Sequence, residues 1–280
     1  MANSKNSLDP EALRLFGAQV DFGNTATDYA THRAGFPQAF FDLLHKRGWV
    51  QASQKAIDLG CGTGTVARGL AQLGLDVTGV DPAQNLLTAA RALNAKDGAT
   101  VHYVNAYAET TGLPGFAYHL VTAGQCWHWF DRPRAATEAR RLLTYGGRII
   151  IAHFDWLPQP GSVVEITEKL ILRHNPDWVG AGGTGIYPNW LQDLANAGFD
   201  QIETASFDVI QPYSHAAWRG RIRASAGIAA SLSEEQTRDF DAQLAQTVSD
   251  HFPDTPLLVP HRVWLVTGCR SKNHPAPQSQ

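Results

Sequence analysis

Between residues 55 and 156, short apolar runs alternate with stretches whose apolar residues recur at helical spacing. The apolar runs predict strands at residues 55–59, 75–81, 100–106, 118–125 and 148–154, the last near the sheet centre. The helical stretches lie at residues 63–73, from Pro82 onward, and at about 133–143. Strands separated by helices form parallel sheets covered on both faces, so this alternation predicts a doubly wound α/β fold.

The second half of the chain continues the pattern and adds an insertion. It predicts helices at 162–173 and up to residue 197, a Gly-rich loop at 180–188, and strands near 202–210 and at 261–269. Between these two strands, Ser214 begins one helix, and Ser233 with Gln236 forms a capping box for another. Near the N-terminus, helices are predicted after Asp9-Pro10 and from Pro37 to Gly48. Both additions are expected to cover the carboxyl edge of the sheet as a helical lid.

The composition excludes several classes of partner. The 280 residues are 44% hydrophobic and 18% charged with a formal net charge of −3, which gives no electrostatic case for nucleic acid or an anionic membrane. No apolar run approaches the roughly 18 residues that span a bilayer, and the three cysteines fit no metal or redox pattern. We therefore expect a cytoplasmic protein with no metal site and a small-molecule partner, as a monomer or a homodimer.

The segment "AIDLGCGTGT" (56–65) places Gly60, Gly62 and Gly64 at alternate positions after Asp58. Glycine costs roughly 0.5–1 kcal/mol inside regular structure, so three glycines indicate a ligand lying on the backbone. Residues 62–67 also match a G-x-G-x-x-A dinucleotide pattern, but the alternate spacing fits an amino-acid-plus-nucleoside ligand better. Asp81, at the end of the next strand, suits two vicinal ribose hydroxyls, although it could also be only a helix N-cap.

At these residues the chain resembles the class I S-adenosylmethionine-dependent methyltransferases. The resemblance runs in order through "IDLGCGTG", "VTGVDPAQNLL", "NAYAE", "GQCWHWFD" and "EARRLLTYGGRIII". The segment "DYATHRAGFP" (28–37) is similar to the opening of the subgroup that contains trans-aconitate and ubiquinone-type methyltransferases. The resemblance implies S-adenosylmethionine as the cofactor and S-adenosylhomocysteine as its product.

The resemblance also implies roles for individual residues. The glycines and Asp58 would form the turn under the methionine and ribose, Asp81 would bind the ribose, and Gln125 would lie beside the methyl donor. Pro82 and Ala83 would flank the adenine, Ala108 would lie near its amine with Tyr107 and Glu109, and Tyr29 and Arg33 would close over the methionine. For Glu109 a solvated loop acid, and for Tyr29 and Arg33 a helical surface pair, remain alternatives.

The acceptor side is less determined by the sequence. His128 in "CWHWF" is a candidate general base, and packing between Trp127 and Trp129 is the alternative. The predicted acceptor contacts are Trp127, Trp129, Trp156, Trp178, Tyr187, Trp218 and Arg219. A solvated Arg219 and structural tryptophans remain the alternatives.

Together these features predict a Rossmann-like seven-stranded sheet, mostly parallel with the last strand antiparallel, plus a helical lid. The expected segments are an N-terminal lid segment (1–50), a cofactor-binding core (51–160), a core continuation with the Gly-rich loop (161–213), a helical cap (214–252), the last strand (253–270) and a disordered tail (271–280). The expected reaction is methyl transfer to N or O of a small, planar heteroaromatic metabolite. O-methylation of a small carboxylic acid, a nicotinamide-dependent oxidoreductase and a non-catalytic cofactor-binding protein are the alternatives.

Overall fold

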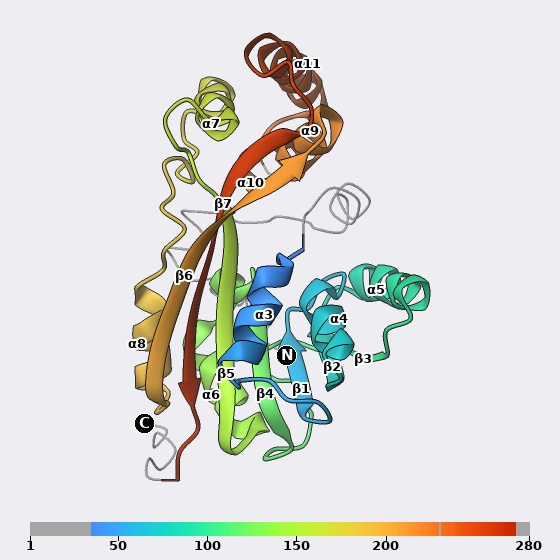
Figure 1. Cartoon of the computed structure of the whole chain (residues 1–280), viewed down its shortest axis with the longest axis vertical. Helices are drawn as coiled ribbons and strands as arrows, with labels where there is room; N and C mark the ends of the chain where they lie inside the picture. Colours follow the sequence, from blue (N-terminus) through green and yellow to red (C-terminus); the bar gives the residue numbers. More distant parts are fainter. Residues whose placement is uncertain (1–34, 230, 273–280) are drawn as a thin grey trace, which may run out of the picture.

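The structure is a computed structural model that describes residues 35–229 and 231–272. Seven strands form one sheet in the order β3-β2-β1-β4-β5-β7-β6 (Figure 1). Their bounds are β1 Lys55–Leu59, β2 Asp76–Asp81, β3 Val101–Asn105, β4 Tyr118–Gly124, β5 Leu143–Trp156, β6 Asp200–Tyr213 and β7 Leu257–Cys269. The strands β1 to β5 pair in parallel, and β7 runs antiparallel to both β5 and β6. The predicted sheet, with its antiparallel last strand, is confirmed.

The predicted central strand lies one place away from the centre. In the sheet order, β4 is the middle strand and β5 lies between β4 and β7. The run at 148–154 is continuously apolar because its side chains alternate between two buried faces. Ile149 and Ile151 pack into one core cluster, and Ile150 and Phe154 pack into the other. A continuously apolar strand therefore indicates that both faces of the strand are buried, and it does not indicate that the strand is the middle one of the sheet.

Helices cover both faces of this sheet. On one face lie α3 (Gln38–Lys46) and α4 (Thr65–Gln72), which contribute Phe40, Leu44 and Leu70 to the core. On the other lie α6 (Arg132–Leu142) and α8 (Asn189–Asn196), which contribute residues such as Ala139 and Trp190. The helix α5 (Gln84–Asp97) follows β2 and buries Leu87. The predicted helix ending at Gly48 is thus α3, and it packs on the sheet as part of the body.

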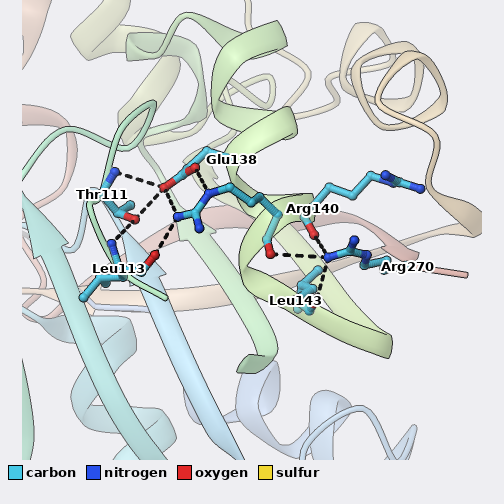
Figure 2. Close-up of polar contacts among 7 residues, drawn as sticks. Thr111, Leu113, Glu138, Arg140, Leu143 and Arg270 are labelled. Carbon is cyan, nitrogen blue, oxygen red and sulfur yellow. Dashed lines mark hydrogen bonds and ion pairs between the residues drawn. The ribbon is translucent and has the colours of Figure 1, made fainter. Parts of the chain in front are cut away.

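Polar contacts fix the end of α6 to the last strand. Figure 2 shows the Arg270 guanidinium beside the carbonyl groups of Arg140 and Leu143, to which its Nη1 donates at 2.5 and 2.7 Å. A cation at this position compensates the negative end of the helix dipole. Nearby, Glu138 accepts from the Thr111 backbone amide at 3.0 Å. Burial raises the pKa of Glu138, but its hydrogen bonds with Arg141 and Thr111 outweigh this and lower it.

The cap is a separate helical layer on three extended strands. The strands β5, β6 and β7 run on beyond the others and carry α7 (Val163–His174), α9 (His215–Arg223), α10 (Ala226–Ala229) and α11 (Glu234–His251) (Figure 1). Its core contains Ile171, Trp218 and Phe240. The predicted capping box of Ser233 and Gln236 is present. The sequence analysis placed 161–213 with the sheet, but α7 packs in this cap, since Trp218 Nε1 donates to Thr167 Oγ1 at 3.0 Å.

A carboxyl group is buried between β1 and β4. Asp58 is 1% exposed and accepts a hydrogen bond from Thr122 Oγ1 at 2.7 Å. Burial raises the pKa of Asp58 to about 7, against the lowering effect of this bond. Because water is excluded, ionising the group inside the folded protein costs free energy that ionising it in the unfolded chain does not.

The stability of the protein should therefore depend on pH through Asp58. Its raised pKa contributes stability that is complete below pH 4 and is lost as the pH rises through about 7. In Asp58→Asn the side-chain oxygen that accepts from Thr122 remains, but the side chain can no longer ionise. The free energy of unfolding of the variant should therefore rise relative to wild type between pH 4 and 7, on the order of 1–4 kcal/mol in all. Urea denaturation across this pH range measures the difference. Asp76→Asn, on the exposed start of β2, is the control, and profiles of Asp58→Asn and wild type that run parallel would contradict the assignment.

A second prediction concerns the contact between α3 and α4. A Cβ on Gly69 would overlap the ring of Phe41, which is 7% exposed and packs at 5.1 Å against Phe40. Alanine favours a helix over glycine by about 1 kcal/mol, whereas overpacking costs about 1–3 kcal/mol. Gly69→Ala should therefore destabilise the protein in denaturant unfolding. The same change should cost less in a Phe41→Leu background, and an equal cost in both backgrounds would show that the ring is not the obstacle.

Candidate functional site

The glycine turn links β1 to α4 at the carboxyl edge of the sheet. Gly60, Gly62 and Gly64 have φ angles of +61°, +53° and +79°, a region that L side chains rarely adopt. A Cβ on Gly60 would lie 2.8 Å from Phe130 Cζ, and one on Gly64 would overlap the Tyr103 hydroxyl. A Cβ on Gly62 would meet nothing within 4 Å. The place where a side chain of residue 62 would lie is therefore open.

Asp81 holds this turn from the end of the neighbouring strand. Its Oδ2 accepts from the Gly62 amide at 2.9 Å, and its Oδ1 accepts from the Ala83 amide at 2.8 Å. The side chain is 7% exposed. Burial raises the pKa of Asp81, and the two amides partly offset this. Because each carboxylate oxygen can accept more than one hydrogen bond, both can also receive hydroxyl groups. The N-cap of α5 is Ala83, so Asp81 is not the cap of that helix.

Asp58 does not share this position. Its carboxyl group lies within the sheet, bonded to Thr122, so it supports the turn from below. The sequence analysis grouped it with the cofactor contacts, and burial corrects that assignment.

The predicted adenine side is built around the loop that follows β3. Asn105 Nδ2 donates to the Pro82 carbonyl at 2.9 Å, which joins the ends of β2 and β3. Ala108 is 3% exposed and Tyr107 is 60% exposed. Glu109 Oε1 accepts from the Asp131 amide at 2.9 Å, so it fixes the start of α6. Glu109 thus has a structural bond within the chain, and contact with adenine stays a prediction for it.

The loop after β4 is fastened to both neighbouring strands. The Gln125 amide donates to the Ala152 carbonyl of β5 at 2.8 Å, and Cys126 Sγ lies 3.1 Å from the Leu59 carbonyl of β1. Gln125 has a φ of +61°, which costs of order 1–3 kcal/mol for a residue with a side chain. Such strain persists only where the surrounding contacts impose it, and here they hold Gln125 beside the glycine turn.

The three aromatic residues that follow have different environments. Trp127 is fully buried and donates from Nε1 to Asp193 Oδ2 at 2.9 Å. Its predicted contact with the acceptor is therefore corrected, because the ring is part of the core. Trp129 is half-buried. The His128 ring is buried, with its centroid 5.0 Å from that of Trp129 and 5.2 Å from that of His153.

A polar cluster at the end of β5 joins Tyr187, a predicted acceptor contact, to His153 and Asp155, for which the sequence predicted no role. His153 Nδ1 is 2.8 Å from Asp155 Oδ1, and the Tyr187 hydroxyl donates to Asp155 Oδ2. Tyr187 also stacks on Trp190 with ring centroids 4.3 Å apart. Alternate residues of a strand point to one face. The spacing of His153 and Asp155 was therefore the signal in the sequence for this pair.

The other predicted acceptor residues divide between the site and the cap. Trp156 is half-buried, donates to Glu168 Oε1 at 2.9 Å, and lies under Arg221, whose Cζ is 4.8 Å from the ring centroid. Trp218 is fully buried in the cap, so its predicted contact with the acceptor is corrected. Trp178 is half-buried and packs on the same cap core.

Arg219 also belongs to the cap rather than to the acceptor side. It forms a bidentate pair with Asp241 of α11, which Arg223 also contacts at 2.8 Å. Its predicted contact with the acceptor is therefore not supported. Tyr29 and Arg33 lie outside the described residues, so their predicted role stays a prediction.

The described residues contain neither a metal-binding cluster nor a helix that could cross a membrane. Across 35–229 and 231–272, no group of three or more His, Cys, Asp or Glu side chains is arranged to hold a metal ion. Within the same ranges, no helix has the length and apolarity to cross a membrane.

The first half of the chain is similar to known methyltransferases. A family model described as a methyltransferase domain matches residues 57–151, from β1 into β5. An uncharacterised methyltransferase of Mycobacterium tuberculosis is 30% identical over 151 residues, which cover 52% of this chain and 59% of that protein. A ubiquinone biosynthesis O-methyltransferase of Cereibacter sphaeroides is 28% identical over 53% of this chain and 61% of that protein. The chain thus spans about three fifths of the length of these relatives.

Solved structures agree on the fold. A protein of Anaeromyxobacter dehalogenans assigned to the type II methyltransferases superposes with a TM-score of 0.60 at 24% identity, over 85% of this chain and 98% of that one. The phosphoethanolamine N-methyltransferase 2 of Haemonchus contortus, solved with S-adenosylhomocysteine, gives 0.54 at 18% identity over 90% of this chain and 58% of that one. The chain is therefore similar to methyltransferases over residues 57–151 and shares the fold of these solved methyltransferases.

Proposed function

We propose that this protein transfers the methyl group of S-adenosylmethionine to a nitrogen or oxygen atom of a small, planar heteroaromatic molecule. The observation that carries the cofactor half is the open face of Gly62 beside a carboxylate that already holds the Gly62 amide. S-adenosylmethionine fits this place because the vicinal hydroxyls of its ribose can bond to Asp81, while the ribose and the methionine lie against glycines.

The remaining cofactor contacts follow from the same placement. Pro82 and Ala83 would flank the adenine, and Ala108 with Tyr107 would lie near its amine. Gln125 would lie beside the sulfonium, since its loop is bonded to the ends of β1 and β5 through Cys126 and its own amide. The methyl donor is already activated, so the protein mainly has to align the nucleophile and exclude water.

The acceptor half rests on the aromatic residues that remain after the corrections. Trp129, Trp156 and Tyr187 are half-buried and come from the carboxyl ends of β4 and β5 and from the Gly-rich loop. Glu168 holds Trp156 and that loop together, because its two oxygens accept from Trp156 Nε1 and the Gly182 amide at 2.9 Å each. Flat rings that are fixed in this way suit a planar acceptor.

A small carboxylic acid is the second candidate acceptor, and Arg221 favours it. This guanidinium lies over Trp156, at the end of β5, with its Cζ 4.8 Å from the ring centroid. A guanidinium beside an aromatic wall suits an acid with a flat or apolar body.

A mass-shift screen tests the reaction. The protein is incubated with S-adenosylmethionine and separate panels of heteroaromatic compounds and small carboxylic acids, and products heavier by one methylene group are sought. Methylation in the first panel supports the proposal, and methylation only in the second supports the carboxylic acid. S-adenosylhomocysteine that binds without any methylated product in either panel would favour a non-catalytic binding protein.

The ribose contact is tested by Asp81→Ala. The substitution removes charged hydrogen bonds, so S-adenosylhomocysteine should bind about 2–4 kcal/mol more weakly in calorimetry. Because Asp81 also holds Gly62 and Ala83, the melting temperature is measured in parallel to separate lost contacts from a disturbed turn. Asp76→Ala, at the exposed opposite end of β2, is the matched control and should bind normally. Unchanged affinity in Asp81→Ala would remove the ribose assignment.

A further inference from the structure

The end of β5 carries a histidine with the surroundings of a general base. His153 is 5% exposed, and its Nδ1 is 2.8 Å from the Asp155 carboxylate. The carboxylate is partly exposed and also accepts from the Tyr187 hydroxyl. At the other side of the ring, His153 Nε2 is buried and has no hydrogen-bond partner among the described residues.

These contacts fix the tautomer of the imidazole. At 2.8 Å, the contact between Nδ1 and the Asp155 carboxylate makes the ring the donor and Asp155 the acceptor. Burial raises the pKa of Asp155, but the charge interaction and hydrogen bond with His153 and the bond from Tyr187 outweigh it and lower the pKa to about 2. The proton of neutral His153 therefore lies on Nδ1, and the lone pair lies on Nε2. A carboxylate behind Nδ1 orients the ring and stabilises the imidazolium that forms when Nε2 takes a proton.

The position of His153 in the sheet brings it to the methyl-donor side. The residue before it, Ala152, accepts from the Gln125 amide at 2.8 Å, so His153 begins the part of β5 that lies against the loop of residues 125–129. The His128 ring of that loop is 5.2 Å from the His153 ring. Trp129 of this loop and Trp156 at the end of β5 are two of the acceptor contacts proposed above, and His153 lies near both, three residues before Trp156 and in ring contact with His128.

We propose that His153 is the general base of methyl transfer, with Asp155 and Tyr187 as its positioning residues. This inference rests on the proposed function and names the proton acceptor of the same site. The nitrogen or oxygen of the acceptor's N–H or O–H group attacks the methyl carbon. At the same time the carbon–sulfur bond breaks, and its electron pair stays on sulfur. The proton of the nucleophile passes to His153 Nε2 and later to solvent, which leaves a methylated acceptor and S-adenosylhomocysteine.

The groups around His153 are consistent with this role. Asp155 supplies a negative charge from the same strand, and Tyr187 and His128 face the ring from the Gly-rich loop and the loop after β4. Burial, followed by the charge of Asp155, raises the pKa of Tyr187, so its hydroxyl stays neutral and donates. From α8 and β7 the neighbouring side chains are the uncharged indoles of Trp190 and Trp264.

The first experiment needs no acceptor. In protein with ¹⁵N-labelled histidine, saturated with S-adenosylhomocysteine, nuclear magnetic resonance should show His153 as the Nδ1–H tautomer. Asp155→Asn can place an amide N–H group against Nδ1, so part of His153 should change to the Nε2–H tautomer. An Nε2–H tautomer in the wild type, or a tautomer that is unchanged in Asp155→Asn, would overturn the inference.

The second experiment measures turnover with an acceptor from the screen. His153→Asn should lower kcat by roughly 10²–10⁴-fold and abolish the rise of rate with pH, while the affinity for S-adenosylhomocysteine is retained. Asp155→Asn leaves the base in place but favours the wrong tautomer, so kcat should fall by up to about 10⁴-fold. His128→Asn should lower kcat by less than tenfold and keep the rise of rate with pH. His102→Asn, at an exposed position of β3, is the control and should match wild type.

A chemical rescue experiment distinguishes loss of the base from loss of the fold in His153→Ala. Added imidazole should restore part of the turnover of His153→Ala, whereas a histidine with a structural role would not be replaced in this way. Failure of the inference is distinct from failure of the proposed function. If His153→Asn keeps wild-type turnover and pH dependence, only the base is wrong, and if wild type methylates nothing, the function itself is wrong.

Discussion

The hydrogen bond from the Gly62 amide to Asp81 is the contact on which the cofactor side depends. It joins the turn after β1 to the end of β2, and it does so with a carboxylate that burial makes costly to ionise. Parallel pairing of β1 with β2 brings the two strand ends to one edge. The left-handed backbone of the turn then directs the Gly62 amide toward Asp81. Without the parallel register the acid would have no turn to hold, and without the glycines the turn could not reach it.

The same edge explains why the acceptor side is divided between the sheet and the cap. The strands β5 and β7 continue past the end of β4, and their antiparallel pairing extends to Trp156 and His261. The cap helices pack on this extension, so Trp156 at its end stays half-buried, whereas Trp218 of α9 lies in the buried core of the cap. Trp156 and Trp218 show the two outcomes at a ring distance of 5.7 Å.

The pattern of apolar residues predicted the elements well because strands such as β1 and β4 are short, largely buried runs between polar or turn residues. The strand at 55–59 has the predicted bounds, and the helix after Ser233 begins as predicted. The tertiary placement of α7 could not be predicted in this way. Its apolar stripe fits a sheet face as well as a helix face, and only the length of β5 decides between them. The same applies to Trp127, whose burial depends on Asp193 lying opposite its indole.

Site residues were predictable where a motif required a backbone conformation, and were missed where chemistry arose from distant segments. The three glycines indicated a backbone with positive φ angles, since no other residue adopts those angles readily. The cluster of His153, Asp155 and Tyr187 requires a loop more than thirty residues further along to return to β5, and the bond between Glu168 and the Gly182 amide is what holds that loop in place. A sulfonium donor transfers its methyl group without help to the leaving sulfur. The choice of acceptor therefore lies in the groups that receive the acceptor and its proton, and we propose that here they come from β5 and the Gly-rich loop.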